Sequence, residues 1–372
     1  MTQKIGLYYK IFMNKKILIT GITGYVGLGI AKRLINEGFS VLGLVRGNNK
    51  TFNKKVEILL RDLKIKDKLT FINWDLEKDE NLDKKYLNKI THIIHSAADT
   101  RFNVDRETAN ITNVEGSRKV FELARMCPNL ESFNYISTIY SCGLAEGEIS
   151  EVHHKSKKFA NYYEKSKFDA EWILKKDYKD LPWQILRVAT IISDDNKGRV
   201  TQQNAFHNTL KLFFYGLLSL VPGDKNTPLY FVTGRFVIDA IYELLHKCNP
   251  KSIYHLCHTF EESSTLGELL DLAYDRFNSE EDFQSRNILP PILCDLKSFN
   301  LLAGETKKMG ATVMGQGMGS IAPFAQQLFS KKNFLNQNLQ NRMKKYSAPD
   351  PKGVLDSVCG FLVKTRWGRR VN

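Results

Sequence analysis

Three polar side chains are spaced as a proton-transfer site would require. Tyr163 and Lys167 stand four residues apart, and Thr138 precedes them. Residues four apart on a helix share one face, so the phenol and the ammonium would lie side by side. A phenol has a pKa of about 10, and a nearby ammonium lowers that pKa towards the range of efficient proton transfer. We expect Tyr163 to exchange a proton with a substrate oxygen that the Thr138 hydroxyl holds.

For these residues a purely structural role, or a neighbouring residue in the same role, is an alternative. A tyrosine four residues before a lysine is common on helices and usually packs beside a surface cation. Tyr162 competes with Tyr163 for the phenol, although Ser166 stands four residues after it and supplies no charge. Ser137 competes with Thr138 in the same way.

A glycine-rich turn near the start of the chain predicts a bound dinucleotide. Residues 17–19 form an apolar run typical of a buried parallel strand, and helical spacing begins at Tyr25. Gly21 permits a sharp turn, Gly24 leaves room for a pyrophosphate, and Gly27 lets the helix pack closely on the strand. The phosphates would lie at the helix N-terminus. The nicotinamide would then transfer hydride while Tyr163 donates the proton.

The residue after the second expected strand favours NADP(H). An acidic residue there would accept a hydrogen bond from a ribose hydroxyl, whereas Arg46 complements a 2′-phosphate. Lys167 could also bind the nicotinamide ribose. We expect the cofactor contacts to be Thr20, Gly21, Thr23, Gly24, Tyr25, Val26 and Gly27 in the turn, Arg46, Asp75 and Leu76 around the adenosine, and Ser96, Ala97, Ala98, Asn113, Lys167 and Val188 at later strand ends and helices.

The elements that must position these residues alternate between strands and helices. Apolar runs predict strands at 17–19, 39–45, 69–75, 90–95, 133–138 and 183–188, and a returning strand at 252–256. Helical spacing predicts helices from Tyr25, around residues 110–116, over 162–171 and over 235–245. This order indicates an α/β fold, a Rossmann-like doubly wound parallel sheet with its site at the carboxyl ends of the strands. A smaller, mostly helical C-terminal portion would bind the substrate.

We divide the chain on this basis. Residues 1–13 form a peripheral extension, residues 14–200 with a returning segment at about 228–260 form the NADP-binding domain, and residues 201–372 form the substrate-binding or lid portion. The region 203–224 is apolar and expected to be helical. Its longest apolar run, residues 212–221, is about half the length of a bilayer span, so we expect a buried helix or the wall of an apolar substrate pocket rather than a membrane span. We take Asp99, Phe102, Ile139, Phe213 and Phe214 as substrate contacts. Beyond Leu293 no clear period is visible.

Composition narrows the partners. The formal net charge is +14, and residues 306–372 hold twelve basic against two acidic residues. Such a segment suits a cofactor phosphate, coenzyme A, an acidic carrier protein or peripheral contact with a membrane, although a solvated lysine-rich face is an equal alternative. We expect no nucleic acid. Six scattered cysteines and the absence of a secretory signal indicate reduced thiols and a cytoplasmic protein. His153 and His154 are adjacent, which is poor metal-ligand geometry, and we expect no metal.

Several stretches together resemble a known superfamily. They are residues 20–27, 44–46, 95–102, 113–116, 135–140, 163–171 and 185–187. They resemble the extended short-chain dehydrogenases/reductases, over roughly residues 14 to 260. Within these, residues 95–102, the region of Thr138, and residues 221–224 ahead of 231–233 look most like the male sterility, fatty acyl-CoA reductase and thioester reductase branch.

The resemblance implies NADPH-dependent reduction of an acyl thioester to an aldehyde, with a further step to an alcohol left open. Hydride addition would give a hemithioacetal, held by Thr138 and Tyr163, that expels the thiol. The runner-up is an NADP-dependent reductase or dehydrogenase of a sterol-like, flavanonol-like or β-keto acyl substrate. A nucleotide-sugar epimerase is disfavoured by Arg46, and a non-catalytic NADP-binding regulator by the presence of both Tyr163 and Lys167. Chain length, carrier, final product and oligomeric state stay open.

Overall fold

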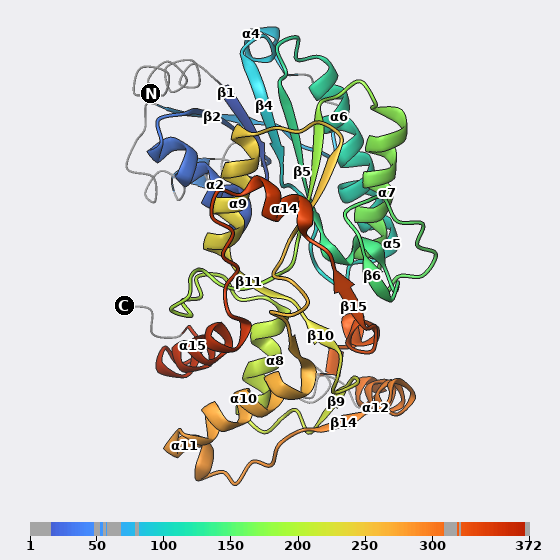
Figure 1. Cartoon of the computed structure of the whole chain (residues 1–372), viewed down its shortest axis with the longest axis vertical. Helices are drawn as coiled ribbons and strands as arrows, with labels where there is room; N and C mark the ends of the chain where they lie inside the picture. Colours follow the sequence, from blue (N-terminus) through green and yellow to red (C-terminus); the bar gives the residue numbers. More distant parts are fainter. Residues whose placement is uncertain are drawn as a thin grey trace.

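A seven-stranded sheet forms the upper half of the molecule (Figure 1). The computed structural model describes residues 16–47, 53–54, 57, 68–78, 82–308, 318–319 and 321–368, so the expected extension at 1–13 lies outside the described residues. The strands are β1 (Lys16–Thr20), β2 (Ser40–Val45), β3 (Leu69–Asn73), β4 (Ile90–His95), β5 (Ser132–Thr138), β7 (Trp183–Val188) and β12 (Ser252–Leu256). Their order is β12-β7-β5-β4-β1-β2-β3, and each neighbouring pair is parallel. The predicted doubly wound fold is confirmed, with its switch point between β1 and β4.

Helices cover both faces of this sheet, which is why its strands read as continuous apolar runs. One face carries α2 (Tyr25–Asn36) and α9 (Gly234–His246), which pack on each other and share a core cluster with β1. The other carries α6 (Gly116–Arg125) and α7 (Tyr162–Asp177), seen on the right of Figure 1. Short elements join them: α4 (Lys84–Leu87), α5 (Arg106–Ala109), the π-helix η1 (Asn110–Glu115), the 3₁₀-helix η2 (Ile139–Cys142) and β6 (Gly147–Ile149).

The lower half is built around a second apolar core. It contains α8 (Ala205–Phe214), β9 (Leu220–Pro222), β10 (Pro228–Leu229), β13 (Ser264–Thr265), α10 (Leu266–Asn278), α11 (Glu281–Gln284), β14 (Ile292–Cys294), α12 (Leu296–Lys308) and α15 (Pro351–Lys364). Two parallel paired strands, β8 (Thr190–Ser193) and β11 (Phe231–Thr233), lie between the halves (Figure 1).

The prediction of one helical region over 203–224 was wrong. Helix α8 ends at Phe214, and β9 begins at Leu220 and pairs with β14. Gly216 has φ +70°, the left-handed conformation that glycine tolerates best. Its N–H donates to the Phe213 carbonyl and the Leu217 N–H donates to the Leu212 carbonyl, the paired bonds of a Schellman motif. A single glycine in the apolar run therefore ends the helix, and residues 212–221 are not one helix.

The C-terminal residues divide between the two halves. After η3 (Ala322–Leu328), strand β15 (Lys332–Phe334) pairs with β6, and α14 (Gln337–Arg342) lies beside β12 and α9 (Figure 1). Phe334 and Leu339 are buried in the core cluster that contains β1 and α9. Part of the segment that we expected in the substrate-binding portion thus contributes apolar side chains to the core of the sheet half. The division at residue 200 itself stays a prediction.

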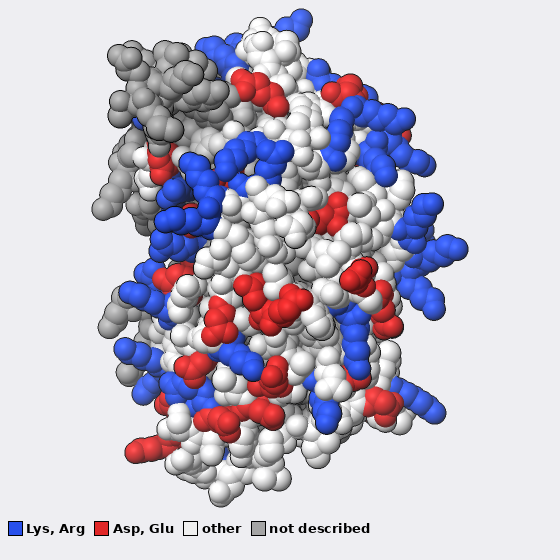
Figure 2. All heavy atoms as spheres, in the orientation of Figure 1, with Lys and Arg blue, Asp and Glu red and all other residues white. Residues whose placement is uncertain are grey.

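The surface charge is distributed unevenly. In Figure 2, basic side chains gather around α2, α9 and α14, and acidic ones form a band across the lower half near α10. Part of the C-terminal basic excess is paired or buried: Lys331 contacts Asp224, Lys352 contacts Glu268, and Lys332 is buried. None of the described helices has the length and apolarity to cross a bilayer.

Candidate active site

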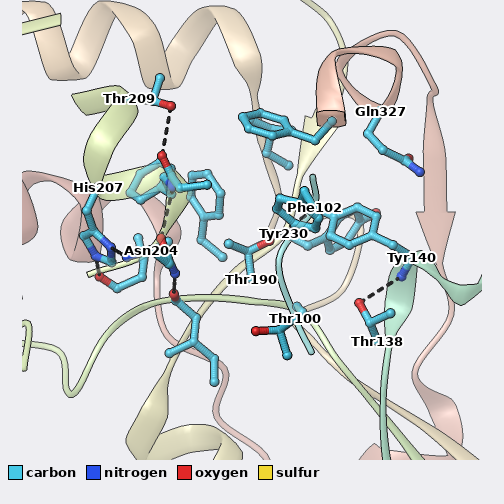
Figure 3. Close-up of a pocket in the computed structure, with 18 of the residues that line it drawn as sticks. Thr100, Phe102, Thr138, Tyr140, Thr190, Asn204, His207, Thr209, Tyr230 and Gln327 are labelled. Carbon is cyan, nitrogen blue, oxygen red and sulfur yellow. Dashed lines mark hydrogen bonds between the residues drawn. The ribbon is translucent and has the colours of Figure 1, made fainter. Parts of the chain in front are cut away.

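A cavity of about 870 Å³ lies between the carboxyl ends of the strands and the lower half (Figure 3). From the sheet half, Gly24, Ser96, Thr138 and Val188 line it, and they stand at or after the ends of β1, β4, β5 and β7. Helix α7 adds Tyr163 and Lys167. The cavity lies at the edge where ligands of open α/β sheets bind, which is where the sequence led us to expect the site.

The start of α7 fixes the orientation of the phenol and the ammonium. Asn161 caps the helix, and its side-chain oxygen accepts a 2.9 Å hydrogen bond from the Glu164 N–H. Thr138 ends β5 and caps η2, accepting a 3.3 Å hydrogen bond from the Tyr140 N–H, which Figure 3 shows. Thr138, Tyr163 and Lys167 thereby line one cavity.

The two rival residues are placed differently. Tyr162 is 48% exposed and is not among the side chains that line the cavity in the described part of the chain. Ser137 reaches the cavity wall, but its hydroxyl donates a 2.5 Å hydrogen bond to the buried carboxylate of Glu171. Tyr163 and Thr138 are therefore better placed than their neighbours to contact a ligand.

The pKa of Tyr163 shifts opposite to the direction that the sequence suggested. Burial raises its pKa, and a hydrogen bond with Thr138 opposes that shift. The Lys167 ammonium instead donates a 2.7 Å hydrogen bond to the Ile136 carbonyl and lies 4.1 Å from the centre of the Tyr135 ring. Burial lowers the pKa of Lys167 to about 7, against the attraction of Glu171. The Tyr163 phenol is thus protonated at neutral pH, the state required of a proton donor.

The glycine turn is shaped to hold an anion. Gly21 has φ +69°, and a Cβ there would lie 2.6 Å from the Ala97 nitrogen. A Cβ on Gly27 would lie 2.2 Å from the Gly21 oxygen. Gly24 caps α2 without a side-chain hydrogen bond, and Gly24, Tyr25 and Val26 line the cavity. The free N–H groups of the first helical turn can donate hydrogen bonds to a phosphate, so these residues fit a dinucleotide.

A buried chain of hydrogen bonds supports the glycine turn on the side away from the cavity. The Thr20 hydroxyl lies 2.7 Å from His95 Nδ1 and accepts a hydrogen bond from the Ala97 N–H. His95 Nε2 lies 2.9 Å from the Ser117 hydroxyl. Burial, reinforced by the charge of Lys167, holds the pKa of His95 well below its usual value, so the ring is neutral. Thr20 is buried and braces the turn rather than lining the cavity.

Asn113 joins the strand end after β4 to helix α7. Its side-chain oxygen accepts from the Asp99 N–H at 2.7 Å, and its side-chain nitrogen donates to the Asp99 carbonyl and to the Ser166 hydroxyl, both at 2.9 Å. It lies in η1, and π-helical turns are frequent at functional sites. The Asp99 carboxylate pairs with Arg101, which lowers its pKa. Asn113 and Asp99 stand behind the cavity wall.

The residues expected around the adenosine lie at the surface. The Arg46 guanidinium donates to the Glu77 carboxylate at 3.2 Å, with side chains 60% and 42% exposed. Asp75 accepts from the Glu77 N–H, and Leu76 packs near Gly116. A surface ion pair of this kind contributes little to stability, so a 2′-phosphate could replace the Glu77 carboxylate on Arg46.

Comparison with known proteins decides the family. A family model described as male sterility protein matches residues 19–241. This chain belongs to the male sterility protein family. Among curated members and relatives, an alcohol-forming fatty acyl-CoA reductase of Simmondsia chinensis is 24% identical over 175 residues, which are 40% of this chain and 36% of that protein. Fatty acyl-CoA reductase 2 of Mus musculus is 30% identical over 164 residues, 38% of this chain and 31% of that protein. The chain spans between about a third and half of the length of the curated relatives it matches.

Solved structures extend the similarity over the whole fold. The terminal R domain from the myxalamid biosynthetic pathway aligns with a TM-score of 0.72 and 18% identity, covering 95% of this chain and 91% of that one. A UDP-glucuronic acid 4-epimerase from Bacillus cereus, in complex with NAD, aligns with a TM-score of 0.66 and 16% identity, covering 95% and 99%. At these identities the similarity shows the fold alone. The matching family model and the neighbours solved with NAD support a nicotinamide dinucleotide as the cofactor.

The expected site residues of this family member fall into three groups. Those lining the cavity are Gly24, Tyr25, Val26, Ser96, Ala98, Phe102, Thr138, Tyr163, Lys167, Val188 and Phe213. A second group that does not line it comprises Thr20, Gly21, Thr23, Gly27, Arg46, Asp75, Leu76, Ala97, Asp99 and Asn113, of which Thr20, Ala97, Asp99 and Asn113 form hydrogen bonds behind its wall. Ile139 and Phe214, expected as substrate contacts, are not among the described residues that line the cavity: Ile139 is buried in the sheet core, and Phe214 packs on Phe277, Phe283 and Trp367 in the lower core.

Among the residues of the cavity wall that sequence reasoning missed are Tyr140, Glu164, Gln327 and Lys332. Glu164 stands inside the motif that contains Tyr163, so its position was a usable signal. Gln327 and Lys332 come from η3 and β15, in the stretch without a clear period. Among the residues that the structure describes, no group of three or more His, Cys, Asp or Glu side chains is placed to hold a metal ion.

Proposed function

We propose that this protein reduces an acyl thioester to an aldehyde with NADPH, using Thr138, Tyr163 and Lys167. One observation carries the proposal: these three side chains and the glycine turn converge on a single cavity in a member of a reductase family. The curated relatives named as fatty acyl-CoA reductases and the R-domain fold support an acyl substrate.

The side chains divide the proton and oxygen chemistry between them. The bound cofactor supplies hydride to the thioester carbonyl carbon. The Thr138 hydroxyl holds the carbonyl oxygen, and Tyr163, protonated at neutral pH because burial raises its pKa, donates the proton. Lys167 binds the ribose beside them. The resulting hemithioacetal then loses its thiol and leaves the aldehyde, whose further reduction to an alcohol is an open outcome.

The lower wall of the cavity suits an acyl chain. Phe206, Phe213, Leu218, Val221 and Leu269 line it, all from the lower half. Because burying apolar surface is favourable by about 25 cal/mol per Å², such a wall would stabilise a hydrocarbon tail against water. Arg46 supports NADPH over NADH. The thiol of the thioester could belong to coenzyme A or to an acidic carrier protein. A cytoplasmic location stays a prediction.

The experiment is turnover of the wild-type protein with a long-chain acyl-CoA and NADPH. NADPH absorbance, free thiol and the extracted product are measured in the same reaction. Aldehyde or alcohol formed with one thiol per acyl group would establish the function. If NADPH is consumed with a β-keto acyl compound but the acyl-CoA is not reduced, the protein is instead a ketone reductase.

A further inference from the structure

A buried polar network occupies the cavity wall next to the catalytic side chains. Glu164, Gln327 and Lys332 all line the cavity, and each is at most 7% exposed. The Lys332 ammonium donates a 2.5 Å hydrogen bond to the Gln327 side-chain oxygen. The Gln327 side-chain nitrogen donates to the Glu164 carboxylate at 2.9 Å and to the Gly143 carbonyl at 3.3 Å. The network thus joins α7 to the C-terminal segment.

Its position relates it to the reacting carbonyl. Glu164 follows Tyr163 in α7, and Gly143 ends the short helix that begins after Thr138. Tyr163 therefore has a direct chain neighbour in the network, and the short helix that follows Thr138 ends at it. Figure 3 shows Gln327 on the side of Thr138 and Tyr140, and Asn204 and His207 of α8 on the opposite side.

The buried charge is only partly satisfied by the protein. An ammonium has three donors, and in the described structure Lys332 donates to one neutral side-chain oxygen. Glu164 accepts from the Ala160 N–H, from Asn161 and from Gln327, which fill three of the roughly four acceptor sites of its carboxylate, and no hydrogen bond to Lys332 is among them. Burying a cation is costly unless it is hydrogen-bonded, and Lys332 faces a cavity rather than solvent. The arrangement therefore offers donors to an acceptor on a bound molecule.

From this geometry we infer that Lys332 and Gln327 form a subsite for the amide nearest the sulfur on the thiol arm of the substrate. The inference rests on the proposed function. Helix α8 supplies Phe206 and Phe213 to the apolar wall, and its first turn lies across the cavity from Gln327 in Figure 3. With the acyl chain on the α8 side of the carbonyl, the thiol arm would extend toward Gln327 and Lys332. The amide carbonyl accepts from the Lys332 ammonium, and Gln327, fixed by Glu164, keeps that ammonium in place. Coenzyme A and carrier-bound pantetheine share this amide.

The test compares two thioesters of the same acyl chain. An N-acetylcysteamine thioester carries the amide, and an ethanethiol thioester lacks it. We expect Lys332→Met to lower kcat/KM for the amide-bearing substrate by roughly 10- to 100-fold, the factor for a hydrogen bond to a charged donor, and to leave the ethanethiol substrate within about threefold. Lys331→Met is the matched control, because Lys331 is half-exposed and pairs with Asp224 at the surface.

The ethanethiol substrate also reports whether the variant folds and carries out the chemistry. An equal loss on both substrates, or no loss on either, would overturn the subsite.

The same pair is also prepared as unreactive thioethers, and their binding is measured by calorimetry. If the wild-type protein turns over no thioester, the proposed function fails. The subsite is still judged by whether the amide-bearing thioether binds more tightly and whether Lys332→Met removes that difference; equal binding of the two thioethers to wild type overturns it.

Discussion

The buried ion pair behind the candidate site gives a sharp stability prediction. Glu171 and Arg187 are both 1% exposed, and the guanidinium donates three hydrogen bonds of 2.6 to 3.2 Å to the two carboxylate oxygens. Ser137 donates to the same carboxylate, and His255 lies 3.2 Å from the guanidinium. This pair joins β5, β7, α7 and β12 beneath Thr138. We predict that Glu171→Gln strongly destabilises the fold.

The magnitude follows from what the substitution leaves behind. Gln keeps the shape of the side chain but removes its charge, so Arg187 becomes an uncompensated buried cation. Breaking a buried pair in this way costs about 3 to 5 kcal/mol. The matched control is Asp169→Asn on the same helix, where Asp169 pairs with a half-exposed Lys165. A surface pair of that type contributes about 0.3 to 0.5 kcal/mol.

Urea denaturation followed by tryptophan fluorescence and circular dichroism measures both variants. A Glu171→Gln protein within about 1 kcal/mol of wild type, or no less stable than Asp169→Asn, would refute the reasoning. Acid supplies a second readout. Burial acts to raise the pKa of Glu171, but Arg187 and the hydrogen bonds outweigh it, so the folded pKa lies below its usual value. The pair therefore contributes stability above the unfolded pKa of about 4.3, and this contribution is lost as the pH falls through the folded pKa. Glu171→Gln should lack that loss.

Three further predictions concern the cofactor and the proton. Gly27→Ala should cost about 1 to 3 kcal/mol of stability and weaken NADPH binding in titrations, because its Cβ would meet the Gly21 oxygen. Gly304→Ala, inside α12 and with no atom within 4 Å of its Cβ, should leave NADPH binding unchanged and stabilise the fold by about 0.5 to 1 kcal/mol. Arg46→Ala should raise the KM for NADPH by roughly tenfold and leave that for NADH unchanged, as measured by initial rates; equal effects on both would exclude a phosphate contact. Burial lowers the pKa of Lys167 to about 7, so the ammonium loses its proton as the pH rises through that value. Reductive kcat/KM should therefore fall over the same pH range. A flat profile from pH 6 to 9 would contradict a role for the charge.

Local sequence patterns were sufficient for the sheet and for the glycine turn. Residues 17–19 are fully buried in β1 because an apolar run without a polar face has only one stable environment in such a fold. The spacing of Gly21, Gly24 and Gly27 predicted close approaches that the structure contains. Helix α7 begins one residue before Tyr163, so the four-residue spacing to Lys167 places both side chains at the cavity.

What sequence reasoning missed depends on contacts between distant segments. Gln327 meets Glu164 across 163 residues, and no local pattern encodes that contact. The pKa of Tyr163 is raised rather than lowered because its burial arises from tertiary packing, while Lys167 is held by the Ile136 carbonyl. Strand β15 is only three residues long, too short for a period to be seen in the sequence, and its Phe334 is buried in the core of the sheet half.

The most direct test of the proposed chemistry is the reductive turnover of Tyr163→Phe with a long-chain acyl-CoA, measured beside NADPH binding to the same protein. The phenol hydroxyl is the proposed proton donor, and loss of a positioned acid lowers rates by roughly 10²- to 10⁴-fold. We predict a fall of that size with NADPH affinity unchanged. A variant that binds NADPH and retains turnover within about threefold of wild type would contradict the account.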